Sequence, residues 1–265
     1  MSQVFADAIY APKELAVALV DGLVAEGHDV TFVTTGDVVT NGRLLAGDQA
    51  YIDLITHKSS PNQLHLVKRD YEIDLMTKAV YEARNSSYDV VHLYAKDFAH
   101  YFDGLFAPAL TVYTLHDPVR QPGTLAYVVY EKFKAHRFVA ISNSQKEAYR
   151  GKGFNVVDTV HHGIDTAQYP YGSAAQNGFV FLGRLVPEKG VEDAIKACVV
   201  SNEKLLIGSQ FPKHGEESEY YKTSVAPMLD DPKIEEVGMV TDGAKAALLG
   251  KAKALLFPIK REEPF

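Results

Sequence analysis

The stretch that decides the fold reads Phe179-Val-Phe-Leu-Gly-Arg-Leu-Val-Pro-Glu-Lys-Gly-Val-Glu-Asp-Ala-Ile-Lys-Ala197. Its apolar start predicts a buried strand over 179–182, followed by a loop from Gly183 to Gly190. The residues after Gly190 predict an amphipathic helix, because apolar side chains recur at the spacing of one helix face: Val191, Ala194, Ile195 and Ala197. A strand, a loop and a helix in this order favour an anion at the carboxyl edge of a parallel sheet, near a helix N-terminus.

The loop carries two cations, Arg184 and Lys189. The Arg guanidinium offers a planar fork of donors and the Lys ammonium a compact charge, and a diphosphate can use both. The residues alone leave a second interpretation open. Surface loops with two solvated cations are common, and such a loop needs no ligand.

Composition narrows the class of protein. The chain has 265 residues, 46% of them hydrophobic, and a net charge of −7, which is typical of a globular protein with one large or two smaller domains. The acidic balance and the lack of a basic tract argue against nucleic-acid binding. The single cysteine, Cys198, fits a reducing compartment, so we expect a cytoplasmic protein. No apolar run approaches the ~20 residues of a membrane-spanning helix, so we expect no integral membrane segment.

Strands and helices alternate along the first part of the sequence, as in a parallel α/β domain. Asp117 and the preceding His116 follow one predicted strand directly, at the edge where such sheets bind ligands. Ser144 and Glu147 have the spacing of a helix capping box, and 56–70 reads as a loop. The expected strands are 4–6, 30–33, 88–94, 110–115, 138–141 and 156–160, and the expected helices are 13–26 and 71–84.

A Pro, Gly and Ser-rich run from Tyr169 to Ser173 predicts the domain junction. We therefore expect one domain over 1–170 and a second over 171–265. The alternation continues in the second domain. Its expected strands are 179–182, 205–207, 234–237 and 254–257, and its expected helices begin at 191, 217 and 243.

Four residues, Gly183, Arg184, Lys189 and Gly190, match position for position a Gly-Arg-x-x-x-x-Lys-Gly run that opens the donor domain of glycosyltransferase family 4. The chain resembles that family over nearly its whole length. The resemblance implies an α/β protein of the GT-B fold, in which two Rossmann-like parallel-sheet domains face a cleft. The first domain would lie on the acceptor side, and the second would bind the donor.

The resemblance also implies site residues. Arg184 and Lys189 would hold the donor diphosphate, and His116 would line the donor-sugar site. The donor-binding residues would be Gly183, Gly208, Met239, Val240 and the closing Glu263-Pro264-Phe265, which resembles the opening of the family's Glu-Pro-Phe-Gly segment.

The function implied is transfer of a glycosyl unit, with retention at the anomeric carbon, from a nucleotide diphosphate sugar such as a UDP or GDP sugar. The acceptor would be a hydroxyl of a saccharide, a lipid-linked sugar or a small molecule. No metal and no other cofactor is expected, because Arg184 and Lys189 would neutralise the leaving diphosphate.

The sequence departs from the family pattern in two places. Many relatives have two adjacent glycines before the first helix, where this chain has Tyr10-Ala11-Pro12. The family motif that Glu263 opens continues beyond Phe265, so we expect an incomplete chain that covers about two thirds of a typical member.

Other functions stay open at this point. A non-catalytic fragment that binds nucleotides or sugars is favoured by both departures. A nucleotide-sugar 2-epimerase has the same fold, although no carboxylate pattern for it is evident. A Rossmann dehydrogenase would need Gly-x-Gly-x-x-Gly and a P-loop enzyme Gly-Lys-Ser/Thr, and neither occurs. A purely structural α/β domain is the remaining alternative.

Overall fold

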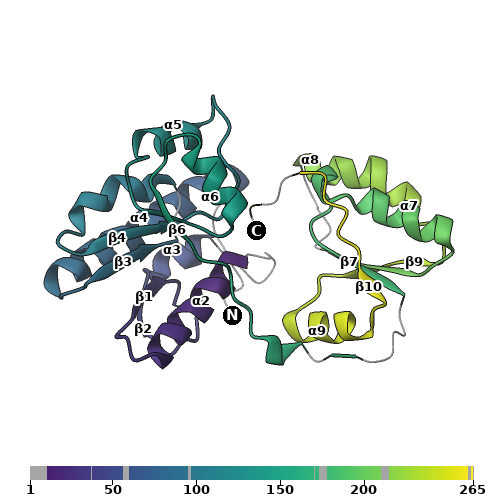
Figure 1. Cartoon of the computed structure of the whole chain (residues 1–265), viewed down its shortest axis with the longest axis horizontal. Helices are drawn as coiled ribbons and strands as arrows, with labels where there is room; N and C mark the ends of the chain where they lie inside the picture. The colour runs from purple at the N-terminus through teal and green to yellow at the C-terminus, as the bar shows by residue number, and fades with distance from the viewer. Residues whose placement is uncertain are drawn as a thin grey trace. The chain divides into compact units, whose positions relative to one another are not determined.

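The computed structural model describes residues 11–36, 38–55, 60–94, 97–169, 171–172, 178–209, 215–261 and 264. The chain forms two compact units (Figure 1). The first ends at Ile164 and the second begins at Asp165, a few residues before the expected junction, and Pro264 groups with the first unit. Each unit is an α/β structure with a parallel sheet, as the sequence predicted.

The first unit is built on a four-stranded parallel sheet in the order β3-β4-β5-β6. The strands are β3 (Val90–Leu93), β4 (Leu110–Thr114), β5 (Phe138–Ala140) and β6 (Val156–Thr159). Because all four run in the same direction, the segments that follow them leave the sheet at one edge. That edge carries His116, and it is where ligands bind in open parallel sheets.

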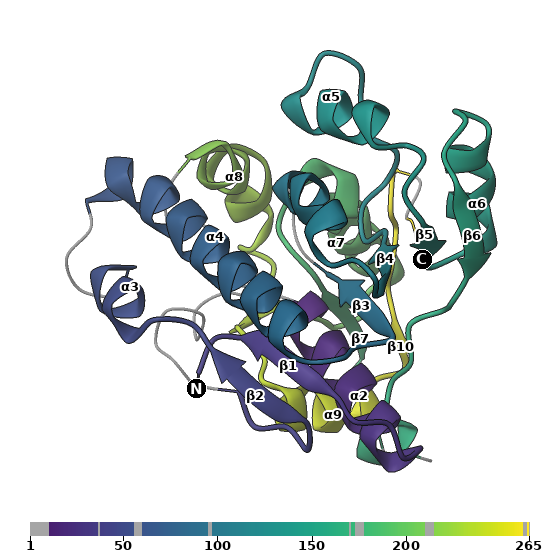
Figure 2. The same cartoon turned by 90° about the vertical axis from the view of Figure 1, so that its left-hand side faces the viewer.

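Two further strands of the first unit, β1 (Thr31–Thr34) and β2 (Arg43–Ala46), form a separate parallel pair. The hydroxyl of Tyr88 donates to Thr31 Oγ1 at 2.8 Å, and the Arg43 guanidinium pairs with Glu82 at the end of α4. Helix α4 packs against β1 (Figure 2). The pair is therefore attached to the rest of the unit through the C-terminal part of that helix.

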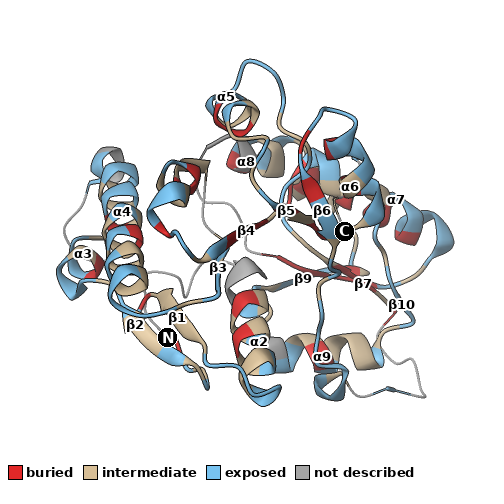
Figure 3. Ribbon diagram, turned by 60° about the vertical axis from the view of Figure 1, so that its left-hand side comes forward, coloured by how far each residue is buried: buried red, intermediate tan, exposed pale blue. Residues whose placement is uncertain are grey.

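The helices of the first unit are α2 (Ala11–Ala25), α3 (Gln49–Asp53), α4 (Pro61–Asn85), α5 (Leu125–Lys132) and α6 (Asn143–Arg150), with a 3₁₀ segment at Asp97–Leu105. The core of the unit lies between these helices and the sheet, and buried residues occur on strands such as β4 and on helices such as α2 (Figure 3). It is rich in aromatic side chains: Phe106, Tyr113, Tyr130, Phe138, Tyr149 and Phe154.

The second unit has a four-stranded parallel sheet in the order β10-β7-β8-β9. Its strands are β7 (Phe179–Leu182), β8 (Leu205–Gly208), β9 (Ile234–Gly238) and β10 (Ala254–Leu255). Its helices are α7 (Val191–Ser201), α8 (Gly215–Tyr220) and α9 (Asp242–Lys251), and α8 continues through a π turn at Tyr221–Val225 and a 3₁₀ turn at Ala226–Met228.

The face that α7 buries differs in one residue from the prediction. Val191, Ala194 and Ile195 are buried as expected, but Ala197 is exposed and Cys198 is buried in its place. Positions 191, 194, 195 and 198 follow the i, i+3, i+4, i+7 pattern of a helix that begins at Val191. The prediction for Ala197 was wrong because 100° per residue turns that side chain away from the sheet.

Several other local predictions were wrong. The expected loop over 56–70 contains the start of α4, with Pro61 in its first turn, where proline is tolerated. Ala11 and Pro12, expected to lie before the first helix, form the first turn of α2. The cap of α6 is Ser142 and not Ser144, since the Ser142 hydroxyl accepts the Gln145 N–H at 3.2 Å. The strand expected over 4–6 lies outside the described residues.

Candidate functional site

The strand ends of the second unit are joined through their backbones. The Gly183 N–H, just after β7, donates to the Gly208 carbonyl oxygen at 3.2 Å. The Ser209 N–H, just after β8, donates to the Gly238 carbonyl oxygen at 3.0 Å. The turns that follow β7, β8 and β9 therefore form one connected edge, and Gly183, Gly208, Met239 and Val240 all lie on it.

Gly208 is required for the close approach of two of these turns. A Cβ at this position would lie 2.7 Å from Val240 Cγ2 and would also overlap the Leu182 side chain. Such separations are below van der Waals contact, so a side chain at 208 would push Val240 away. Met239, beside Val240, is 41% exposed, which leaves an apolar side chain open at the edge that was predicted to bind the donor.

The cationic loop is anchored by apolar residues in its middle. Leu185 and Val186 are buried, whereas Arg184 is exposed and Lys189 is half-buried. Pro187–Lys189 form one 3₁₀ turn that ends at Gly190. The burial of the middle of the loop fixes its path and leaves the two cations at its ends on the outside.

Gly190 is the second glycine that the site requires. Its backbone is left-handed, with φ 72° and ψ 26°, and a Cβ there would overlap the Pro258 carbonyl oxygen. Only glycine adopts this conformation without cost. The Lys260 N–H donates to the Glu188 carbonyl oxygen at 2.9 Å, so the segment after β10 braces the turn from the other side. The ammonium of Lys189 lies 5.7 Å from the centroid of the Phe257 ring, within cation–π range.

The N-terminus of α7 follows Gly190 and carries two carboxylates in its first turn, Glu192 and Asp193. Asp193 pairs with Lys260 at 3.0 Å and Glu192 with Lys196 at 3.4 Å. These acidic groups already complement the positive end of the helix dipole. An anion at this edge would therefore depend on the side chains of Arg184 and Lys189 more than on the helix terminus.

In the first unit, His116 lies just beyond β4 within a group of aromatic rings. Its ring is parallel to that of His162, with centroids 5.3 Å apart and an interplanar angle of 9°, and Tyr94 lies 4.6 Å away at a tilt of 46°. Both ring nitrogens of His116 are buried and have no hydrogen-bond partner among the described residues.

This environment keeps the His116 ring neutral near pH 7. Burial, and then the neighbouring His162, lower the pKa of His116 from 6.5 to about 4, against an opposing effect of Asp117. A neutral imidazole carries one N–H donor and one acceptor. Leaving such groups buried and unpaired costs roughly 1–3 kcal/mol each. The ring is therefore suited to an uncharged hydroxyl partner.

Of the closing residues Glu263-Pro264-Phe265, the structure describes Pro264. Pro264 groups with the first unit, where its carbonyl oxygen accepts a hydrogen bond from the Ser142 hydroxyl. Ser142 thus both caps α6 and holds Pro264. Glu263 and Phe265, predicted to bind the donor, lie outside the described residues, so those two assignments stay predictions.

Sequence reasoning missed two neighbours of His116. Tyr94 was taken as the end of the strand predicted over 88–94, and His162 was not singled out. Both follow strands of the same parallel sheet, β3 and β6, as His116 follows β4. Strand direction was the available signal, because parallel strands bring the residues after their carboxyl ends to one edge.

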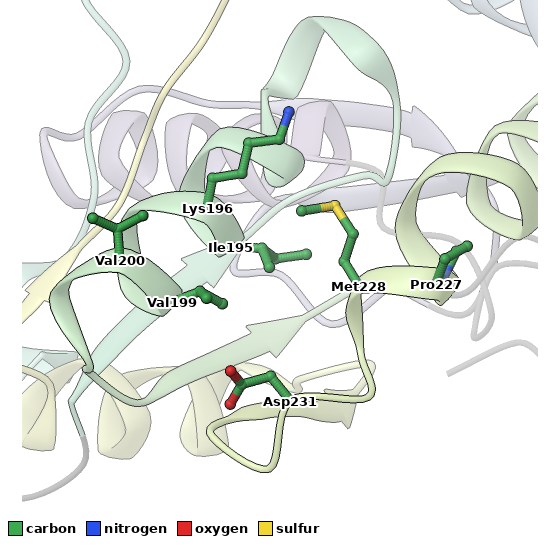
Figure 4. Close-up of a pocket in the computed structure, with 7 residues that line it drawn as sticks. All are labelled: Ile195, Lys196, Val199, Val200, Pro227, Met228 and Asp231. Carbon is green, nitrogen blue, oxygen red and sulfur yellow. The ribbon is translucent and has the colours of Figure 1, made fainter.

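The structure also has a shallow apolar pocket between α7 and the turn at Ala226–Met228 (Figure 4). It is lined by Ile195, Lys196, Val199, Val200, Pro227, Met228 and Asp231. These α7 residues belong to the half of the helix remote from Gly190. The pocket is therefore separate from the strand-end edge and contains none of the predicted site residues.

The chain belongs to Glycosyltransferase Family 4, whose family model matches residues 14–168, more than half of the sequence. The family was predicted from the Gly183–Gly190 loop, which lies outside the matched range. No curated protein matches the chain significantly.

Solved structures of similar fold include several glycosyltransferases. HepE of Anabaena, in complex with UDP and glucose, superposes with a TM-score of 0.56 at 18% identity, over 72% of this chain and 57% of its own. Sucrose-phosphate synthase of Thermosynechococcus elongatus gives 0.68 at 14% identity, over 94% and 69%. AviGT4, a glycosyltransferase involved in avilamycin A biosynthesis, gives 0.56 at 17% identity, over 94% and 61%.

These similarities confirm the predicted fold, two parallel-sheet domains of the GT-B type. The chain spans 57% of the length of HepE and 61% of that of AviGT4. Among the described helices none is both long and apolar enough to cross a membrane. The described part of the chain also contains no group of three or more His, Cys, Asp or Glu side chains arranged to hold a metal ion.

Proposed function

We propose that the protein is a retaining glycosyltransferase that moves a sugar from a nucleoside diphosphate sugar to a hydroxyl acceptor. The observation that carries this proposal is the braced cationic loop at the strand ends of the second unit. Family membership and fold agree with it. The acceptor class stays broad and covers saccharides, lipid-linked sugars and small molecules.

Arg184 and Lys189 are assigned to the donor diphosphate. Breaking the glycosidic bond of the donor places negative charge on the departing diphosphate, and fixed cations stabilise that charge in the transition state. Removing one such contact is expected to cost roughly 10²–10³ in rate, by analogy with oxyanion-hole donors. The two cations supply the neutralisation, so the proposal requires no metal and no other cofactor.

His116 is assigned to a hydroxyl of the donor sugar. Its ring is neutral and its nitrogens lack partners among the described residues. A hydroxyl both donates and accepts, so it can satisfy an imidazole nitrogen in either tautomer. A diphosphate oxygen could only accept. The two edges therefore suit different chemical groups: His116 an uncharged hydroxyl, and the cationic loop a diphosphate.

The nucleotide base is assigned to the turn after β9, through Met239 and Val240. Gly208 allows Val240 to come close to β8. Gly183, Glu263, Pro264 and Phe265 complete the proposed donor site. HepE was solved with UDP and glucose, so UDP sugars are the first donors to test, followed by GDP sugars. We further propose a cytoplasmic location, on the single and buried thiol of Cys198.

The test is release of nucleoside diphosphate from a panel of UDP and GDP sugars, with and without simple hydroxyl acceptors. The wild type is compared with an Arg184→Ala/Lys189→Ala variant and with a matched control, Lys204→Ala/Lys253→Ala. The control removes the same charge from the opposite edge of the same sheet, before β8 and β10, where Lys204 pairs with Glu235 and Lys253 with Glu203.

The proposal expects turnover of at least one donor by the wild type and the control, and a loss of 10² or more in the loop variant. Equal losses in both variants would contradict the assignment of Arg184 and Lys189. Binding of a nucleoside diphosphate without turnover of any donor would favour a non-catalytic binding module over a transferase.

A further inference from the structure

We propose that His162 is a positioning residue that acts through His116, by stacking on its ring and fixing it for a sugar hydroxyl. The inference rests on the proposed function of His116. It adds a role for the adjacent His161 and His162, which follow β6. The geometry of three strand ends carries it.

The turn after β6 is held in place by a side-chain contact. His161 Nδ1 lies 3.0 Å from the carbonyl oxygen of Ile141, which follows β5. In the sheet order, β5 separates β4 from β6. The His161 contact therefore fixes the turn across the end of β5, and this lets the next residue reach His116 beyond β4.

The resulting pair is nearly parallel. The two imidazole rings are 5.3 Å apart at 9°, and Tyr94 covers His116 from the β3 side at 4.6 Å. Aromatic rings at such separations attract one another beyond the effect of their buried area. Because His116 makes no hydrogen bond to described residues, ring packing alone determines its orientation in this part of the structure.

The same packing decides the charge of His116. The groups that act on its titration are His162 from the β6 side, His92 from β3, and Asp117, the next residue in the chain. Burial is the largest influence, and His162 contributes both ring area and a second titratable group. His92 is itself held by Thr114, with Nε2 and Oγ1 2.6 Å apart. The pKa of His162 is lowered by burial, so the stack is neutral at pH 7.

Two substitutions separate the effect of the ring at position 162 from the effect of its titratable group. His162→Phe keeps an aromatic ring over His116 but removes the titratable group. His162→Ala removes both. Circular dichroism first establishes that each variant folds. The pKa of His116 is then measured by NMR of the labelled imidazole, with the resonance assigned from a His116→Asn variant.

Ligand affinity and KM give a second readout that is independent of the NMR titration. Affinities for UDP and for a turned-over UDP sugar are compared in the same variants. If His162 orients His116 for a sugar hydroxyl, its substitution should lower the affinity for the UDP sugar and leave the affinity for UDP alone unchanged.

The inference expects His162→Ala to raise the pKa of His116 from about 4 toward its ordinary value, and to raise KM for the donor about tenfold, as loss of roughly one hydrogen bond would. His162→Phe should keep a low pKa and a near-normal KM. An unchanged pKa and KM in His162→Ala would overturn the inference.

Failure of the proposed function would give a different result. In that case no sugar-dependent affinity would be found even in the wild type, while the NMR titrations would still report on the stack. A change in UDP affinity in His162→Ala would also overturn the inference, because it would show a general disturbance of the fold.

Discussion

The two sheets of this protein end in chemically different edges. The edge of the second unit carries an exposed Arg184 and a half-buried Lys189 on a loop whose middle is buried. The edge of the first unit carries His116, whose nitrogens are buried and whose ring is neutral at pH 7. In each unit the strands are parallel, so the residues that follow their carboxyl ends gather at one edge of the sheet. The difference shows that topology places a site, whereas burial and charge decide which part of a ligand it can take.

The largest effect is expected at the glycine that shapes the cationic loop. Gly190→Ala forces a Cβ into a left-handed backbone and onto the Pro258 carbonyl oxygen. Strain at such a backbone costs roughly 1–2 kcal/mol, and the clash with backbone adds to it, so we expect a loss of about 3 kcal/mol or more from the second unit. Urea unfolding followed by circular dichroism measures the loss.

Gly243→Ala is the matched control for that experiment. Gly243 lies in α9, and a Cβ there meets no atom within 4 Å. Alanine is the better helix former by up to about 1 kcal/mol, so this variant should be neutral or slightly stabilising. Equal destabilisation by both substitutions would refute the account of the loop.

The next effect is a difference between the two units in how their stability depends on pH. His100 in the first unit is 3% exposed, stacks on Tyr113 at 4.2 Å and faces His136, and burial lowers its pKa to about 4. His116 has a similarly lowered pKa. A His whose folded pKa lies below its unfolded value stabilises the unfolded state when protonated. The first unit should therefore lose stability as pH falls from about 6.5 to 4, by roughly 2–3 kcal/mol for His100.

The second unit should respond less. Its only histidine is His214, outside the described residues, and Glu236 has a pKa raised by burial, which acts in the opposite sense. Amide exchange by mass spectrometry at pH 7 and 5, corrected for intrinsic rates, reports on each unit. His100→Phe should weaken the pH dependence. Earlier loss of protection in the second unit would contradict the comparison.

The smallest effect concerns two helix caps. The Ser142 hydroxyl accepts the Gln145 N–H at the start of α6, whereas Thr241 at the start of α9 makes no side-chain cap bond. Ser142→Ala should cost about 1 kcal/mol and Thr241→Ala no more than a few tenths. Thermal unfolding of the two variants makes the comparison, and a larger loss from Thr241→Ala would count against the observed caps.

The sequence predicted the second unit better than the first. Apolar runs such as Phe179–Leu182 are strands buried in a sheet, and the α7 face follows from helical spacing. In the first unit, the start of α4 is rich in polar residues, so its sequence shows little periodicity and was taken as a loop. The short β2 and α3 were missed because, at 4 and 5 residues, Arg43–Ala46 and Gln49–Asp53 are too short to show a repeating pattern.

The candidate site residues likewise differ in how far the sequence could predict them. Arg184, Lys189 and the glycines around them could be proposed from the sequence because their spacing is local, and their role in donor binding stays a prediction. The His116 environment was only half recognised, because Tyr94 and His162 reach it through strand order and not through spacing. The bracing of the loop by Phe257, Pro258 and Lys260 likewise depends on β10 lying beside β7.

The central claim is that the Gly183–Gly190 loop holds a diphosphate. Isothermal titration calorimetry with UDP and GDP, and with UMP and GMP for comparison, tests it on the wild type, Arg184→Ala/Lys189→Ala and Lys204→Ala/Lys253→Ala. The account predicts that the wild type and the lysine control bind a nucleoside diphosphate more tightly than the monophosphate, and that the loop variant loses this preference. A preference for the diphosphate that survives in the loop variant would contradict the account.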